Sequence, residues 1–220
     1  LKPGTEGSDL RFLTAAGSTL FFSADDGAGN YELWKSDGTA AGTLRLKEIR
    51  AGSAPSDPIF LTAVGNTLYF KANDGLAGAE LWKSDGTASG TVFVKDIAPG
   101  IFGGTQPKSS YPYGFTFING TIFFSARGGA GNELWKTDGT SAGTILVKDV
   151  LAGDRSSYPQ SLVAFQNRLY FRADNGIDGR ELWVSDGTEA GTRLAIDFTG
   201  NSGGSSPSSL TPFGNRMFLF

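Results

Sequence analysis

An eight-residue stretch, Glu-Leu-Trp-x-Ser/Thr-Asp-Gly-Thr, occurs four times in the chain of 220 residues and constrains its fold more than any other feature. The copies begin at Glu32, Glu80, Glu133 and Glu181, and two residues after each copy comes Gly-Thr. Each copy holds one of the four tryptophans, which are therefore spaced by 48, 53 and 48 residues. A period near 50 residues is typical of a repeat protein, in which each repeat folds as one supersecondary unit.

Each repeat contains four short stretches in which apolar and polar residues alternate, as in half-buried strands. The first repeat predicts strands at 10–16, 19–24, 31–35 and 43–49, separated by turns rich in Gly, Asn and Asp. The 32 glycines suit many turns, and no interval has the 3.6-residue apolar period of a helix. The repeats are about 1–49, 50–97, 98–150 and 151–198, with a longer loop at 98–110 and a two-stranded partial repeat at 199–220.

Four short antiparallel strands and one tryptophan in about 50 residues are typical of a β-propeller blade. One four-stranded sheet cannot bury both of its faces, so blades stack with Leu, Phe and Trp side chains between them. The sequence therefore predicts an all-β fold over 1–220, a single β-propeller domain with four complete four-stranded antiparallel blades and the first half of a fifth. A stacked β-solenoid is an alternative, although its coils are usually shorter. Separate hairpin modules are another, although each would be too small to be stable alone.

The expected strands fall two short of a closed ring of five blades. The N-terminus does not supply the missing strands, because Leu1 aligns with Ile49 at the end of a fourth strand. We therefore expect the chain to be a fragment of a larger propeller or repeat array. The apolar strand at 217–220 would then lie at an open sheet edge, covered by the remainder of a longer chain or by a second copy.

Composition excludes several classes of function. The net charge is −3 and the charges are interspersed, so there is no basic stripe of the kind that binds nucleic acid. No apolar run approaches the roughly 20 residues of a membrane-spanning helix, so we expect no membrane insertion. Cysteine and histidine are both absent, which excludes disulfides, thiolate nucleophiles, histidine-based triads and histidine-ligated zinc.

The tryptophan and aspartate of each copy have a structural interpretation. Tryptophan would fill the space between blades, aspartate would accept hydrogen bonds from turn N–H groups, and the following glycine would adopt positive φ. The alternative is that an exposed Asp-Gly-Thr turn contacts sugars or ions. We predict as structural motif residues Trp34, Asp37, Trp82, Asp85, Trp135, Asp138, Trp183 and Asp186.

The motif glutamates are expected to contact backbone or a cross-strand partner at a blade junction. Lys47, Lys95 and Lys148 recur in the fourth strand and are the candidate partners, whereas Ile196 occupies this position in the fourth repeat. A catalytic carboxylate pair needs two acids in one asymmetric pocket, and one acid repeated four times lacks that asymmetry. We therefore predict no catalytic residues.

Two kinds of loop are candidates for binding. Turns rich in Asp and Asn resemble sites for hard cations, which prefer clustered oxygen ligands. Asp174 and Asp178 are the best calcium candidates, although no cofactor is required and such turns also serve structure alone. Loops on a rigid scaffold usually carry function, which makes Tyr111, Tyr113 and Tyr158 candidates for carbohydrate stacking or protein contacts.

The repeated Glu-Leu-Trp-x-x-Asp-Gly-Thr motif resembles the bacterial ELWxxDGT repeat family, and the match is literal in all four copies. The resemblance implies propeller-like modules of large exported or cell-surface bacterial proteins, with no catalytic activity to transfer. We therefore expect a non-enzymatic extracellular binding or structural module, suited to adhesion, that contacts a protein or glycan partner. A lectin-like carbohydrate-binding propeller and a propeller-fold glycan hydrolase or lyase are the alternatives.

Overall fold

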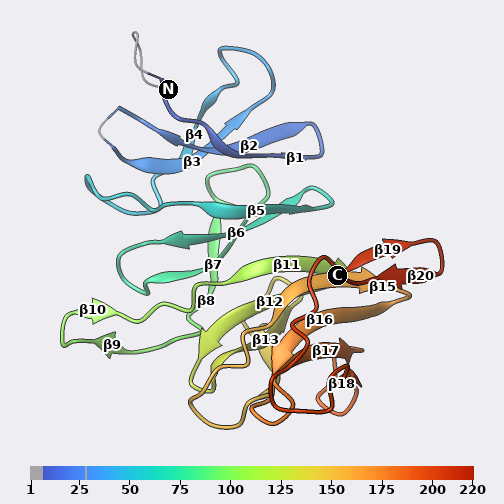
Figure 1. The fold of residues 1–220 in the computed structure, drawn as a ribbon. Coiled ribbons are helices and arrows are strands. Elements are labelled where there is room, and N and C mark those ends of the chain that lie inside the picture. The colour runs from blue at the N-terminus through green and yellow to red at the C-terminus, as the bar shows by residue number, and fades with distance from the viewer. Residues whose placement is uncertain (1–6, 28) are drawn as a thin grey trace. The chain divides into compact units, whose positions relative to one another are not determined.

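The computed structural model describes residues 7–27 and 29–220, and over these residues the chain is all β, with twenty strands and no helix. Four sheets contain four antiparallel strands each, in sequence order (Figure 1). Sheet 1 comprises β1 (Arg11–Ala16), β2 (Thr19–Asp25), β3 (Tyr31–Ser36) and β4 (Leu44–Lys47). Sheet 2 comprises β5 (Ile59–Val64), β6 (Thr67–Asn73), β7 (Ala79–Ser84) and β8 (Val92–Lys95). Sheet 3 comprises β11 (Tyr113–Ile118), β12 (Thr121–Gly128), β13 (Gly131–Thr137) and β14 (Ile145–Lys148). Sheet 4 comprises β15 (Gln160–Phe165), β16 (Arg168–Asp174), β17 (Arg180–Ser185) and β18 (Arg193–Ile196).

Two further hairpins complete the described strands. β19 (Thr211–Phe213) and β20 (Arg216–Phe218) form the two-stranded start of the partial fifth repeat, at the place the sequence predicts. The interval 98–110 is not a plain loop, because β9 (Ile101–Phe102) pairs there with β10 (Gln106–Pro107). That part of the prediction was wrong, since two-residue strands are too short to show an alternating pattern. Within the described residues, no helix is long and apolar enough to cross a membrane.

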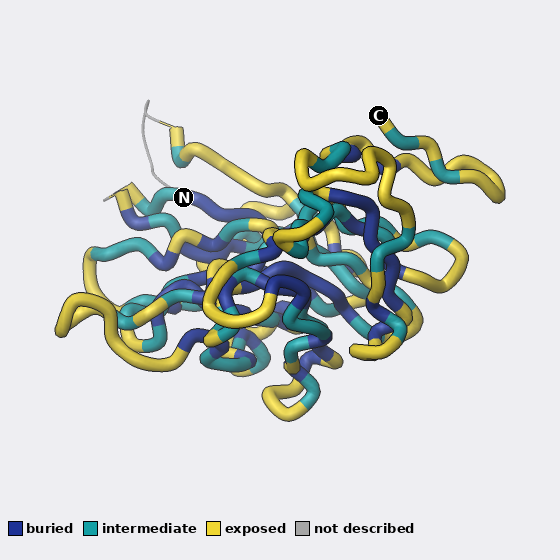
Figure 2. The backbone as a smooth tube through the Cα atoms, turned by 60° about the horizontal axis from the view of Figure 1, so that its bottom comes forward, coloured by how far each residue is buried: buried dark blue, intermediate teal, exposed yellow. Residues whose placement is uncertain are grey.

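The chain forms two compact units, Leu1–Pro112 with sheets 1 and 2, and Tyr113–Phe220 with sheets 3 and 4. In the first unit β1 lies beside β5, and in the second β11 lies beside β15. The core of each unit lies between its two sheets. In the first unit it contains Phe21 and Leu33 of sheet 1 with Phe70 and Trp82 of sheet 2. Figure 2 shows buried strand segments alternating with exposed turns along the chain.

Every four-stranded sheet has the same irregularity in its first strand. The pairing with the second strand shifts register between Arg11 and Thr14, and at the equivalent places in sheets 2, 3 and 4. The residue within the shift adopts left-handed backbone in each sheet, with φ of 57° at Phe12 and 58° at Phe60. Bulges of this kind re-aim side chains, and in sheets 1 and 2 a bulky aromatic residue occupies a conformation that usually needs glycine.

The Asp-Gly-Thr turns have one geometry in all four repeats. In sheet 2, Asp85 Oδ1 accepts hydrogen bonds from the backbone N–H and hydroxyl of Thr87, at 2.8 and 2.7 Å. Thr87 in turn accepts the N–H of Gly90 at 2.9 Å on its hydroxyl and the hydroxyl of Thr91 at 2.7 Å on its carbonyl. A Cβ atom on Gly90 would lie 2.0 Å from Asp85 Oδ1. The aspartate and the second glycine of the motif therefore require each other.

We expect Gly90→Ala to lower the free energy of unfolding by about 1 to 3 kcal/mol, the usual range for overpacking. The cause is the collision with the Asp85 carboxylate. Gly90→Ala should therefore cost less unfolding free energy when it is added to Asp85→Ala than when it is added to the wild type. Gly129→Ala is the matched control, because no atom lies within 4 Å of its added Cβ and its φ is not positive. Urea unfolding measures the free energies of the wild type, Gly90→Ala, Asp85→Ala, the double variant and Gly129→Ala. A Gly90→Ala cost no larger than that of Gly129→Ala would contradict the prediction.

Candidate functional site

The motif glutamates are buried ties between consecutive repeats. Glu80 accepts the backbone N–H of Ile97, at the end of its own sheet, at 3.1 Å. It also accepts the hydroxyl and the N–H of Ser110, which leads into the next repeat, at 2.5 and 2.8 Å. Glu133 and Glu181 bind the equivalent serines in the same way. Glu32 accepts the hydroxyl of Ser56 at 2.7 Å, but the Ser56 N–H donates to the Tyr31 carbonyl at 3.2 Å. Backbone contact at a junction is thus what the structure shows.

The lysines of the fourth strands do not pair with these glutamates, so that alternative was wrong where the contacts are given. Lys47 Nζ instead donates to the carbonyl of Thr91 in sheet 2 at 2.7 Å, and Lys35 Nζ donates to the carbonyl of Gly86 at 2.7 Å. Lys136 and Lys148 make the equivalent contacts from sheet 3 to sheet 4. These lysines therefore join neighbouring sheets within each unit.

Burial affects the protonation of three motif glutamates, Glu32, Glu80 and Glu133. Among the residues that the structure describes, no cation lies against Glu80 or Glu133, and loss of hydration raises the pKa of each carboxyl to about 7, although the donated hydrogen bonds oppose the shift. Burial raises the pKa of Glu32 as well. The pKa values of the exposed Asp37, Asp85 and Asp186 shift the other way, and at Asp85 the hydroxyl and N–H of Thr87 lower the pKa. The motif acids thus serve internal hydrogen bonds.

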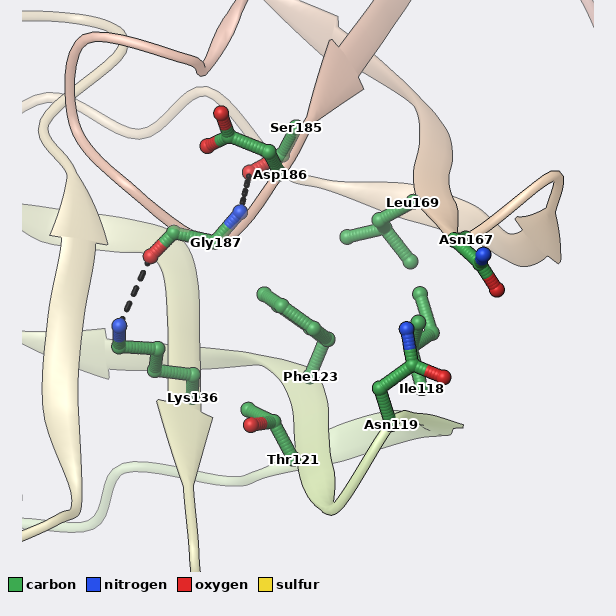
Figure 3. A pocket seen from close by; sticks show the side chains of 10 residues that line it. All are labelled: Ile118, Asn119, Thr121, Phe123, Lys136, Asn167, Leu169, Ser185, Asp186 and Gly187. Carbon is green, nitrogen blue, oxygen red and sulfur yellow. Dashed lines mark hydrogen bonds between the residues drawn. The ribbon is translucent and has the colours of Figure 1, made fainter.

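A cavity of about 180 Å³ lies where sheet 3 meets the Asp-Gly-Thr turn of sheet 4 (Figure 3). Its apolar wall includes Phe123 and Leu169, and Lys136 spans it to reach the Gly187 carbonyl at 2.8 Å. The Asp186 carboxylate points away from this wall in Figure 3. Ligand pockets usually enclose roughly 300 to 1,000 Å³, so the cavity is better explained as a joint between sheets.

The segments that lead into each repeat share one backbone conformation. In every repeat the residue that follows the serine of this segment has left-handed backbone, with φ between 42° and 50°. These residues are Asp9, Asp57, Tyr111, Tyr158 and Ser206. Each segment is held to its neighbour by backbone hydrogen bonds. Tyr111 N–H, for example, donates to the Ala79 carbonyl at 3.1 Å. Positive φ is costly for residues other than glycine. Every repeat nevertheless keeps this conformation, although the side chains differ.

Three positions at each of these junctions carry different side chains on that common backbone. The first is the bulge residue of the first strand. The second is the second-strand residue that pairs with the residue just before the bulge. The third is the left-handed residue that leads into the next repeat. We call each set a junction triad. In chain order the triads are Phe12, Ser23 and Asp57; Phe60, Lys71 and Tyr111; Gly114, Ser125 and Tyr158; Ser161, Arg172 and Ser206.

The second triad combines a cation with two exposed aromatic rings. Lys71 Nζ lies 6.0 Å from the ring centroid of Phe60 and 5.5 Å from that of Tyr111. Phe60 is 43% exposed and Tyr111 is 54% exposed. Burial lowers the pKa of Lys71, while the charge of Asp57 opposes that shift. Among the described residues, no acceptor lies within hydrogen-bond or ion-pair distance of the ammonium.

Other cations near the junctions have polar partners. Arg172 donates to the carbonyl of Ser206 at 3.5 Å and to the side-chain oxygen of Gln160. Arg11 donates to Asp9 and lies 4.3 Å from the ring centroid of Tyr31, whose hydroxyl also donates to Asp9. Lys71 therefore differs from both arginines in what surrounds its charge.

The predicted binding tyrosines are divided between the two units. Tyr111 belongs to the first unit, whereas Tyr158, which is 48% exposed, and Tyr113, which begins β11, belong to the second. The sequence interpretation missed Phe60 and Lys71. The available signal was the set of positions at which otherwise similar repeats differ, but the bulge that turns Phe60 outward is not visible in the residue pattern.

The calcium candidates hold their own turn together. Asp174 Oδ1 accepts the N–H of Gly176 at 2.7 Å, and Asp178 Oδ2 accepts the Asn175 amide at 2.8 Å. No group of three or more Asp, Glu, His or Cys side chains in 7–27 and 29–220 is arranged to hold a metal ion. Calcium binding by this loop stays a prediction, which a thermal melt with and without chelator would test.

Comparisons with known proteins bear on the fold alone. No protein-family model and no curated protein matches the chain. Solved structures that are similar include the computationally designed Ika8 protein, with 16% identity and a TM-score of 0.53 over 96% of this chain and 54% of that one. A mutant of puromycin hydrolase in complex with PGG has 14% identity and a TM-score of 0.57 over 97% and 33%. Puromycin hydrolase has 16% identity and a TM-score of 0.52 over 86% and 29%.

The chain thus spans about half or less of the length of these structures. Propeller-type proteins are among the similar structures, which agrees with the four-stranded antiparallel sheets observed here. At these identities the likeness indicates a propeller-like all-β fold and transfers no activity.

The raised pKa of Glu80 predicts a pH-dependent stability. Between its ordinary value of 4.5 and about 7, the folded chain binds this proton more tightly than the unfolded chain. The unfolding free energy contributed by this group is therefore fully present below about 4.5 and decreases as the pH rises towards 7. Each pKa unit corresponds to about 1.4 kcal/mol.

Glu80→Gln should remove this group's share of the decrease and make the profile of unfolding free energy less steep between pH 4.5 and 7, while Glu133, whose pKa is also raised to about 7, keeps its own share. The variant should also have lower stability at pH 4.5 by about 1 to 3 kcal/mol, because an amide cannot satisfy every donor that faces the carboxyl. The exposed Glu189 gives a control, Glu189→Gln. Urea unfolding at several pH values measures the profiles, and an unchanged slope for Glu80→Gln would show that the prediction is wrong.

Proposed function

We propose that the chain is a non-enzymatic binding and structural repeat module of an exported or cell-surface bacterial protein. It contacts a protein or glycan partner through the loops that connect its repeats. In this proposal the four-stranded sheets are blades of a β-propeller, four complete and a fifth begun by β19 and β20. The resemblance to the ELWxxDGT repeat family supports the bacterial surface setting and a role in adhesion.

One observation carries the proposal: constant motif residues are engaged internally, whereas the left-handed residues that lead into each repeat vary and are exposed. Glu80 and Asp85 illustrate the first class, since their carboxylates accept hydrogen bonds from Ser110 and Thr87. Tyr111 and Tyr158 illustrate the second, with about half of each side chain exposed on a backbone held by hydrogen bonds. A rigid scaffold that presents varied side chains is the usual design of a binding surface.

A lectin-like function is the second candidate, and the exposed aromatic rings favour it. Tyrosine offers a flat apolar face for a sugar ring and a hydroxyl for a polar contact. Tyr111 and Tyr158 occupy equivalent positions, so each could serve one shallow sugar site. Glycan binding would favour this candidate, and binding restricted to proteins would favour the broader module.

Tyr111→Ala and Tyr158→Ala should each weaken binding to a glycan array or to purified surface proteins by up to about tenfold, the equivalent of 1.4 kcal/mol. The reason is loss of an exposed ring from a lead-in segment. Phe102→Ala is the matched control, because Phe102 is a more exposed aromatic residue in the β9–β10 hairpin. Binding that depends on Phe102 alone, or reproducible hydrolysis of a bound glycan, would overturn the proposal.

A further inference from the structure

We propose that Phe60, Lys71 and Tyr111 form a binding site for an acidic saccharide. The Lys71 ammonium pairs with a carboxylate of the sugar, and the two rings contact the apolar face of a pyranose. This inference rests on the proposed binding function and assigns a ligand class to one of its junctions.

The first argument is the unsatisfied charge of Lys71. Its ammonium lies 5.5 to 6.0 Å from two ring centroids and has no carboxylate or carbonyl partner among the described residues. Contact with ring faces recovers only part of the hydration that a half-buried cation loses. A ligand carboxylate supplies a charge-assisted hydrogen bond, which is among the stronger polar contacts in proteins. Arg172, at the equivalent position in sheet 4, already has a backbone carbonyl and an amide oxygen as partners.

The second argument is the way both rings are held. Phe60 and Tyr111 have φ of 58° and 46°, in the left-handed region that bulky side chains rarely adopt. Their rings nevertheless remain 43% and 54% exposed, so burial does not offset the backbone cost. Strained residues of this kind cluster at functional sites, where the surrounding structure fixes them. A backbone that already places both rings beside a cation loses little freedom when a ligand arrives, which favours affinity.

The third argument distinguishes a saccharide from an acidic peptide. Asp57 is exposed and lies near enough for its charge to act on Lys71, although it forms no ion pair with the lysine. A carboxylate beside the cation can accept hydrogen bonds from sugar hydroxyls. The same carboxylate repels a peptide that carries several adjacent acids. A ligand with many hydroxyls, one apolar face and a single anionic group per ring therefore suits the site best.

The experiment is isothermal titration of the full chain with trigalacturonic acid, its neutral methyl ester and a hexaglutamate peptide. The acid trimer should bind at least about tenfold more tightly than the ester or the peptide, and salt should weaken it. Lys71→Met should cost about tenfold or more, and Tyr111→Ala should also weaken binding. Lys71→Arg keeps the charge and should retain most of the affinity.

Lys108→Met removes an exposed lysine of the same unit and is the matched control. Thermal melting shows whether each variant stays folded. Equal affinity for acid and ester, equal or tighter binding of hexaglutamate, or no effect of Lys71→Met in a folded variant would each overturn the inference. If the chain then binds other ligands through Tyr158, the proposed function still stands. If neither the array nor the titration shows any binding, both proposals fail.

Discussion

The buried carboxylate of each motif is the interaction on which the repeat structure depends. It accepts hydrogen bonds from the end of its own sheet and from the segment that leads into the next repeat. A buried acid without a cation partner is unusual, and its position is tolerated because several N–H and O–H donors converge on it. The same contacts set the path of the chain between repeats. Sheet pairing alone would not do so, because no backbone ladder runs from β4 into β5 or from β14 into β15.

Fixing the path in this way separates scaffold from surface. The turn aspartate and the second glycine constrain each other, and the glutamate is held by the serine that leads into the next repeat. The junction triads are free of these constraints. Their backbone is repeated, but the side chains range from glycine to lysine and tyrosine. At the bulge and lead-in positions, which are exposed, this variation lies where side chains can face a partner.

Much of this architecture could be predicted from the residues. The motif spacing predicts the repeats, and the turn signals place most strands within one or two residues of those observed. The Asp85 turn also follows from ordinary turn chemistry. The glutamate contacts were predicted only as one of two alternatives, because a strand position does not reveal which backbone groups will face it. Phe60 and Lys71 could not be found in this way, since a register shift in β5 brings that ring to the lysine.

The lysines that join neighbouring sheets have a consequence for the order of the repeats. Sheets 1, 2 and 3 carry lysine at both positions, as in Lys35 and Lys47, whereas sheet 4 carries Val184 and Ile196 there. A sheet stacked on that side of sheet 4 would meet methyl groups in place of ammonium donors. Its turn carbonyls would need water or other partners. The four repeats are therefore not interchangeable. If their order were changed so that another sheet followed sheet 4, the turn carbonyls of that sheet would face Val184 and Ile196 and would find no lysine donor.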